Sequence, residues 1–232
     1  MDFQAPLYKA SLIRRYSKVL ADVRLESGEK TTVFCSNTTR LKNLSDPGAE
    51  IFLSYCPRPN RRLQWTWELT SANGTLVGVN MEHHCDLVAE AILNNLLPEL
   101  NGYEKIFPDT SPFFDLCLLP PERSGYPPCR IAIASLYQKN GTHLIFPDTI
   151  AVSNHHILTH LTDSLRKGER AVLILLAQRM DCIGVRFDWM ADTAYLVSLK
   201  EAFENKNLEI ICCGCSVSPN GIWIANRLPF TF

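Results

Sequence analysis

The sequence predicts an α+β protein of two domains, a small β-barrel at residues 1–80 and an α/β layer at residues 81–232. In the first part, short runs of β-branched and aromatic residues alternate with turn signals, without a long helical period. In the second part, apolar strand-like runs alternate with helical patterns. Charge divides at the same point: 11 Lys and Arg against 7 Asp and Glu (net +4) come first, then 12 against 17 (net −5). An anionic partner therefore suits the first domain better.

The predicted barrel is built from five strand-like runs. In chain order they are VLADVRLE, TTVFC, EIFLSYC, LQWTWELT and TLVGV. The turn-forming segments SGEK, DPGA and NGT separate several of them, because Gly, Asn, Asp and Pro supply the backbone angles that tight turns need.

The α/β layer begins with a helix that Asp86 could cap, over LVAEAILNNLLPEL. Strands follow at FFDLCLL and RIAIASLY, and a second helix starts near Asn154, with Gly168 beyond its end. Then come a continuous apolar strand (AVLILLAQ), a third helix (TAYLVSLKEAFEN) and a strand (LEIICCGC). This alternation predicts a sheet covered by helices.

The compartment expected from the sequence is the cytoplasm. The first residues lack the basic and apolar regions of a secretory signal, and no apolar run of about 18 residues predicts a membrane span. The nine cysteines are odd in number and lie mostly inside apolar runs, which favours free thiols in a reducing compartment over a disulfide framework.

Clustered cations in the first domain suggest a nucleic-acid partner. They are Arg14, Arg15 and Lys18 before a predicted strand, Arg40 and Lys42 after another, and Arg58, Arg61 and Arg62 beside two tryptophans. A groove that follows a phosphate backbone needs cations, and aromatic faces stack bases. Trp65 and Trp67 share one face of a strand, so packing in the core is the competing interpretation for both.

Two metal-binding patterns are weak. His156 and His160 are four residues apart on a predicted helix, but no third ligand accompanies them. Cys212 and Cys215 form a single CxxC inside an apparent buried strand, without the second pair of a zinc ribbon. Polar residues beside a helix stripe and buried thiols are the expected roles of these four side chains.

A resemblance to a known family then becomes specific. The segments RRYSKVLADV, NTTR, DPGAEIFLS, RRLQWTWELT, GTLVGVN, GERAVLILLAQR and VSPNGI, in this order, resemble the sugar fermentation stimulation protein family. The resemblance implies an N-terminal OB-fold domain and a C-terminal domain like the PD-(D/E)xK nucleases. It also implies DNA binding, with a regulatory link to sugar catabolism genes. Asn37 and Thr38, in the segment that matches the family's His-Cys-Pro-Asn-Thr-Gly, join the expected DNA contacts.

The resemblance also locates a nuclease site that has lost its reactive groups. Asp115 matches the family's Asp, and Asp148 follows as a further remnant, but Ala132 and Ala134 stand where Glu and Lys are usual. Residues two apart on a strand point to the same side, so the family's pair would face one site. Methyl groups neither ligate Mg²⁺ nor carry charge. We therefore expect no catalysis and no cofactor, with at most weak Mg²⁺ binding at Asp115.

The sequence leaves three alternative functions. The first is a module that binds DNA, duplex or single-stranded, beside an inert nuclease-like domain, and we favour it. The second is a protein-interaction scaffold without DNA affinity. The third is a working metal-dependent nuclease that has recruited other groups, for example His155 or His156 near Asp148.

Overall fold

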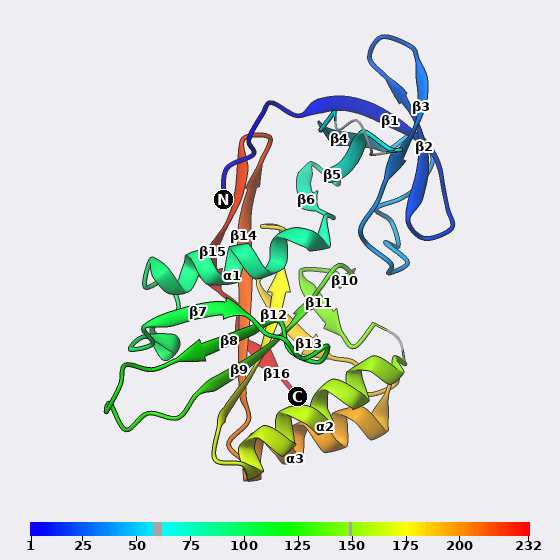
Figure 1. Ribbon diagram of the computed structural model, residues 1–232. Helices are drawn as coiled ribbons and strands as arrows, with labels where there is room; N and C mark the ends of the chain where they lie inside the picture. Colours follow the sequence, from blue (N-terminus) through cyan, green and yellow to red (C-terminus); the bar gives the residue numbers. More distant parts are fainter. Residues whose placement is uncertain (58–61, 149) are drawn as a thin grey trace. The chain divides into compact units, whose positions relative to one another are not determined.

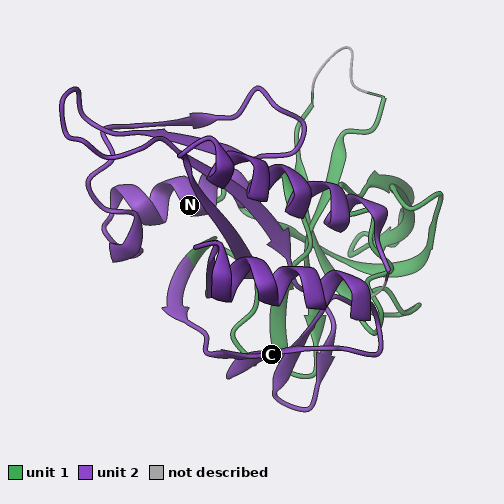
Figure 2. Ribbon diagram, turned by 90° about the horizontal axis from the view of Figure 1, so that it is seen from below, with its two compact units in different colours: residues 1–83, 178–181, 215–223 green, residues 84–177, 182–214, 224–232 purple. Residues whose placement is uncertain are grey.

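The computed structural model describes residues 1–57, 62–148 and 150–232, and these divide into two compact units (Figure 2). Unit 1 comprises residues 1–83, 178–181 and 215–223, and unit 2 comprises residues 84–177, 182–214 and 224–232. The first crossing between units follows His83, close to the predicted boundary at residue 80. The two late segments of unit 1 were not predicted, because sequence patterns do not show which unit a long strand joins.

Unit 1 contains a closed five-stranded barrel of the OB type. Its strands are β1 (Tyr8–Tyr16), β2 (Leu20–Leu25), β3 (Lys30–Phe34), β4 (Glu50–Tyr55) and β5 (Trp65–Ala72). They pair in the order β3-β2-β1-β4-β5, and a parallel contact of Phe34 with Thr66 joins β3 to β5 and closes the ring. β6 (Thr75–Gly78) adds to the free side of β5. This is the five-stranded Greek-key barrel of the OB-fold.

The first barrel strand was not predicted from the sequence. Arg14 and Arg15 lie within β1 itself, at the end that pairs with β2, and not before a strand. A register shift between Leu12 and Arg14 interrupts the alternation that would have marked the strand. The predicted β2 does alternate: Ala21 and Val23 are fully buried inside the barrel.

Unit 2 is built on a mixed sheet with the order β15-β14-β12-β9-β8-β7 (Figure 1). Its strands are β7 (Lys105–Pro108), β8 (Leu116–Leu119), β9 (Cys129–Ser135), β12 (Arg170–Ala177), β14 (Glu209–Ser218) and β15 (Gly221–Arg227). β9, β12 and β14 are parallel, whereas β7 and β8 are antiparallel additions. A second, smaller sheet has the strand order β10 (Lys139–Asn140), β11 (His143–Phe146), β13 (Gly184–Phe187) and β16 (Phe230–Thr231).

Three α-helices belong to unit 2: α1 (His84–Leu93), α2 (Val152–Arg166) and α3 (Thr193–Asn205). The last two match their predicted positions. α1 starts at His84, before the predicted cap Asp86, and ends earlier than predicted. Asn95 adopts a positive φ of 57°, a conformation that Asn tolerates at helix ends, and Pro98 then starts a short 3₁₀ turn (Pro98–Leu100).

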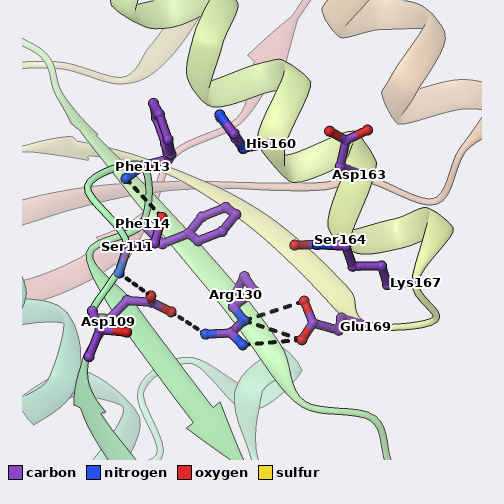
Figure 3. Close-up of a pocket in the computed structure, with 11 residues that line it drawn as sticks. Asp109, Ser111, Phe113, Phe114, Arg130, His160, Asp163, Ser164, Lys167 and Glu169 are labelled. Atoms are coloured by element: carbon purple, nitrogen blue, oxygen red, sulfur yellow. Dashed lines mark hydrogen bonds and ion pairs between the residues drawn. The ribbon is translucent and has the colours of Figure 1, made fainter.

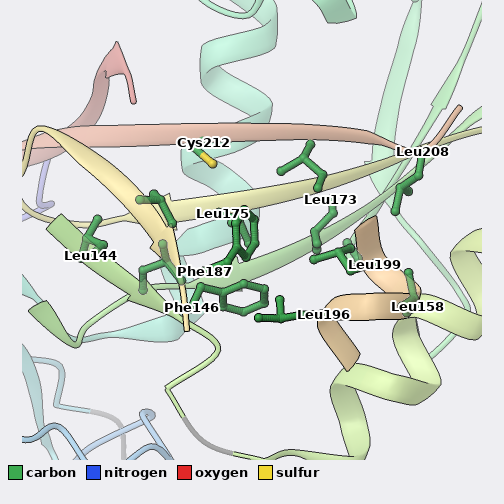
Figure 4. Packing of buried hydrophobic residues seen from close by; sticks show 14 of the residues in the cluster. Leu144, Phe146, Leu158, Leu173, Leu175, Phe187, Leu196, Leu199, Leu208 and Cys212 are labelled. Atoms are coloured by element: carbon green, nitrogen blue, oxygen red, sulfur yellow. The ribbon is translucent and has the colours of Figure 1, made fainter. Parts of the chain in front are cut away.

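The core of unit 2 lies between one face of the central strands and the helices α2 and α3 (Figure 4). Leu173 and Leu175 of β12 meet Leu158 of α2 and Leu196 of α3 in this cluster. Each fully buried Leu contributes roughly 1.5–3 kcal/mol to the free energy of unfolding. α1 contacts β9 but contributes no residue to the cluster, so it belongs to the opposite face of the sheet. Within the described residues, no helix is long and apolar enough to cross a membrane.

Candidate nucleic-acid interface

Five of the predicted nucleic-acid contacts line one groove of unit 1. The groove has a volume of about 460 Å³ and lies where the end of β1, the β1–β2 turn and the loop after β3 come together. The five residues are Arg14, Arg15, Lys18, Thr38 and Arg40. The turn and the loop are distant in the sequence, and closure of the barrel brings them together.

The turn at the edge of this groove has an uncommon backbone, which Arg15 holds in place. Ser17 and Lys18 have φ values of 53° and 61°, in the left-handed region that costs non-glycine residues energy. Arg15 donates hydrogen bonds to the Lys18 carbonyl, at 2.6 Å from Nη2, and to the carbonyls of Thr39 and Asn37 in the facing loop. The Arg15 guanidinium therefore holds the turn against the loop, and its contact with DNA stays a prediction.

The remaining groove cations differ in how far they are neutralised. Arg14 bonds to Asp22, with 2.9 Å between Nε and Oδ2, and lies over the Tyr16 ring. This hydrogen bond is the main cause of the lowered pKa of the Asp22 carboxyl. Lys18 and Arg40 are exposed, and neither has an ion-pair partner within the described part of the chain. The free positive charge of the groove therefore lies mainly on these two residues.

The structure corrects the role expected of Asn37. This side chain is fully buried. Its amide donates to the Val79 carbonyl at 3.2 Å, and its Oδ1 accepts from the backbone N–H and the hydroxyl of Thr39. Asn side chains commonly form such hydrogen bonds within turns, so Asn37 stabilises the loop from inside. Its side chain does not face the groove, whereas the neighbouring Thr38 is exposed there.

A second groove, of about 440 Å³, contains Arg62 and Trp65 together with Tyr55 and residues of β2 and β3. Trp65 is half-buried and packs against Tyr55, with 4.5 Å between the ring centroids, and edge-on against Tyr8. Trp67 instead is fully buried and donates its indole N–H to the Leu69 carbonyl. The core interpretation thus holds for Trp67, while Trp65 borders a groove. Arg58 and Arg61 lie outside the described residues.

Asp115 lies at the edge of the unit 2 sheet, just before β8. Its Oδ2 accepts a hydrogen bond of 2.6 Å from the backbone N–H of Ile133, and its Oδ1 lies 3.4 Å from His84 Nε2. Burial by itself lowers the pKa of His84, but the Asp115 carboxylate and the Cys85 thiol next to it raise the pKa to about 9. This corner of unit 2 therefore favours a positive charge.

The two alanines of β9 occupy apolar surroundings. Ala132 is almost completely buried and belongs to the core cluster under α2 and α3, and Ala134 packs against that cluster. Asp148 is exposed in the loop after β11. His155, proposed as a recruited group near Asp148, is instead directed to Asp192, with 2.9 Å between Nε2 and Oδ2. Asp192 also caps α3 through the Tyr195 N–H, so this contact joins two helices.

A polar pocket of about 440 Å³ in unit 2 was missed by the sequence analysis (Figure 3). Arg130, on the same face of β9 as Ala132, lies between Asp109 and Glu169 and bonds to both carboxylates. His160 lines the same pocket, where its ring stacks on Phe113 at 3.6 Å between centroids. Cys212 and Cys215 are buried in β14, as expected for thiols inside a strand.

A cluster at Asp115 was not predicted from the sequence. His84, Cys85 and Asp115 place one nitrogen, one sulfur and one oxygen within 4.8 Å of one another. What the sequence lacked was the packing of the start of α1 beside the start of β8.

Comparison with known proteins agrees with this architecture. The family description "SfsA N-terminal OB domain" matches residues 13–79, and "Sugar fermentation stimulation protein RE domain" matches residues 82–221. A sugar fermentation stimulation protein homolog of Paramagnetospirillum magneticum is 38% identical over 96% of this chain and 94% of its own length. A homolog from Geotalea uraniireducens is 35% identical over 98% of each chain.

A solved structure shows the same fold. The structure of Pyrococcus furiosus SfsA in complex with Ca²⁺ superposes with a TM-score of 0.86 and 20% sequence identity, covering 100% of this chain and 98% of that one. Together, the two domain matches and the full-length relatives account for both units. The chain belongs to the sugar fermentation stimulation protein family.

Proposed function

We propose that the protein binds DNA through the barrel of unit 1 and regulates gene expression, with a unit 2 that resembles PD-(D/E)xK nucleases but is catalytically inactive. The observation that carries this proposal is the groove in which Lys18 and Arg40 expose unpaired positive charge beside the hydroxyl-bearing Thr38. Phosphate groups supply the anionic ligand such a groove suits, and cations that neutralise phosphates provide most non-specific affinity for DNA.

The positions of both grooves support this proposal. OB-fold barrels bind oligonucleotides on the face of strands 2 and 3 and on the loops that join strands 1–2 and 4–5. Lys18 lies in the β1–β2 turn, and Arg62 lies in the segment between β4 and β5. Leu25 of β2 and Thr31 of β3 line the groove that contains Arg62. Lys18 and Arg62 therefore lie in the loops where this fold binds its ligands, whereas Arg40 lies in the segment between β3 and β4.

Aromatic side chains extend the proposal to single-stranded DNA. Trp65 and Tyr55 border the second groove, and Tyr55 is 40% exposed. Unpaired bases stack on such rings for roughly 1–3 kcal/mol each, without strong sequence preference. We expect Arg62 to contact the phosphate that adjoins a stacked base.

The proposed loss of catalysis is supported by the chemistry available around Asp115. Ca²⁺ and Mg²⁺ take oxygen ligands, and the relative from Pyrococcus furiosus was solved with Ca²⁺. In this chain Ala132 and Ala134 bring no oxygen ligand and no ammonium group to the neighbouring strand, and both pack with apolar side chains. Asp115 has one oxygen bonded to the Ile133 N–H and the other next to His84. Hydrolysis of a phosphodiester therefore lacks here the oxygen ligands that would hold Mg²⁺ or Ca²⁺.

No disulfide joins the cysteines of the described residues, and seven of the nine are buried, which suits the reducing cytoplasm in which a regulator of transcription acts.

The test uses the full chain with labelled duplex and single-stranded oligonucleotides, by fluorescence anisotropy, with Mg²⁺ and with a chelator. With three or more phosphate contacts, affinity should fall about 40-fold between 50 and 200 mM salt. Plasmid incubated with Mg²⁺ or Mn²⁺ should stay intact for both the unchanged protein and Asp115→Ala. Absence of salt-sensitive retention would favour the protein-interaction scaffold, and metal-dependent nicking that Asp115→Ala abolishes would overturn the inactive assignment.

A further inference from the structure

The cluster of His84, Cys85 and Asp115 in unit 2 has no part in the proposed DNA contacts. His84 and Cys85 are the first two residues of α1, and Asp115 precedes β8. The side chains of His84 and Asp115 are 17% and 27% exposed, and Cys85 is half-buried. The cluster is therefore shielded from bulk water but open to a small ion.

The distances within the cluster fit a metal better than a hydrogen bond. His84 Nε2 and Asp115 Oδ1 are 3.4 Å apart, longer than the 2.7–3.2 Å of a good N–H···O bond. Two ligand atoms at about 2.0–2.2 Å from a tetrahedral zinc ion lie about 3.4 Å from each other. The sulfur, nitrogen and oxygen donors all fall within 4.8 Å, so small side-chain movements complete the arrangement.

The surroundings of these donors point in the same direction. His84 Nε2, the ring nitrogen that faces Asp115, lies 3.4 Å from its Oδ1 and so makes no short hydrogen bond to it. Asp115 is oriented by the Ile133 N–H, as outer hydrogen bonds orient metal-binding carboxylates.

The kinds of donor atom in the cluster determine which metal ion it can bind. Thiolate and imidazole select zinc and its neighbours among the transition metals, whereas Mg²⁺ and Ca²⁺ prefer oxygen alone. We propose that His84, Cys85 and Asp115 bind a divalent transition-metal ion of the zinc class. Three protein ligands leave the fourth position to water. The bound ion links the start of α1 to the edge of the sheet at β8, an arrangement separate from the barrel grooves.

The test uses the full chain, stripped by a chelator and titrated with Zn²⁺ and with Co²⁺ as a spectroscopic probe. We expect one equivalent of metal, a near-ultraviolet thiolate-to-cobalt band, and a higher melting temperature with Zn²⁺ than with Mg²⁺. Cys85→Ser should weaken Zn²⁺ binding at least 100-fold and abolish the cobalt band. Cys56→Ser, which removes another half-buried free thiol, is the matched control and should change neither.

His84→Gln should weaken binding to a similar extent. A change at the start of α1 can disturb folding. The proposal is therefore tested with Cys85→Ser, at a position that is only half-buried. Stoichiometric Zn²⁺ binding that is unchanged in Cys85→Ser would overturn the proposal. Equal affinity for Mg²⁺ and Zn²⁺, or no binding at micromolar Zn²⁺, would overturn it as well. DNA retention should be the same in Cys85→Ser, which separates this outcome from the test of the proposed function.

Discussion

The cations of the unit 1 groove and the arginines of the unit 2 sheet differ in their partners. At the groove of unit 1, Lys18 and Arg40 are exposed and unpaired within the described residues, whereas the arginines on the unit 2 sheet are bound by carboxylates. Arg130 bonds to Asp109 and Glu169, and Arg170 bonds to Glu209. A paired arginine stabilises its own unit and offers little charge to a ligand. Charges counted along a sequence do not separate paired cations from unpaired ones, whereas the structure does.

Arg15 and Glu68 qualify this comparison, because they are charged residues of unit 1 with internal roles. Arg15 bonds to three backbone carbonyls. Glu68 is 4% exposed and accepts hydrogen bonds from Ser54, Asn80 and His83 at 2.5–2.8 Å. The comparison predicts that such residues affect stability, and that only the exposed, unpaired cations of the groove affect DNA binding directly.

The largest effect on stability is expected for Arg130→Ala. It leaves the Asp109 carboxylate, only 1% exposed, without its cation. Removing one partner of a buried pair costs 3–5 kcal/mol, and the partial exposure of Arg130 reduces this to about 2–3 kcal/mol. Urea denaturation measures the change. Arg166→Ala, at an exposed pair with Asp163, is the control and should cost less than about 0.5 kcal/mol. Equal losses would show that the pocket pair is not special.

Glu68→Gln should lower the free energy of unfolding by about 2 kcal/mol at pH 7, because hydrogen bonds to a buried charged group are lost. Burial raises the pKa of Glu68, but the hydrogen bond and charge of His83 outweigh it and hold the pKa below its ordinary value of 4.5.

A lowered pKa means that this stabilisation is present above pH 4.5 and is lost as the pH falls through the folded-state value. The stability difference between the unchanged protein and Glu68→Gln should therefore shrink below pH 4.5. Denaturation curves at neutral and acidic pH measure it. A difference independent of pH would mean that the carboxylate charge has no role.

Arg15→Ala should cost about 1 kcal/mol, since the carbonyls of Lys18 and Thr39 remain within reach of water after the change. Arg14→Ala, on the neighbouring exposed position of the same strand, should change stability by less than that. Thermal denaturation of the two variants compares them directly. If Arg14→Ala were the more destabilising change, Arg15 would not be the residue that holds the turn.

Much of the fold was predictable because periodicity reports burial. TAYLVSLKEAFEN became α3 because it buries a regular set of positions, and AVLILLAQ became β12 because a continuous apolar run suits a strand buried on both faces. β1 was missed because its bulge and its polar residues break the alternation. The length of α1 was overestimated because the apolar pattern continues past Leu93, while Asn95 and Pro98 end the helix.

The candidate sites were only half predictable. Composition identified Lys18 and Arg40 as cations, but their common groove depends on the closure of the barrel. No pattern shows that Asn37 turns inward while Thr38 faces out, because that depends on the Val79 carbonyl from a distant strand. Likewise, His84 and Cys85 meet Asp115 only after α1 packs near the sheet edge.

The central claim is that unpaired cations of the unit 1 groove contact phosphate. Its most direct test is the salt dependence of duplex binding, by fluorescence anisotropy, for Lys18→Ala with Arg40→Ala. The account predicts that the slope of log affinity against log salt becomes shallower by about 1.8, since each phosphate contact contributes about 0.9. Lys105→Ala with Arg123→Ala removes the same charge from exposed positions of unit 2 and should leave the slope unchanged. Equal slopes for both double variants would contradict the account.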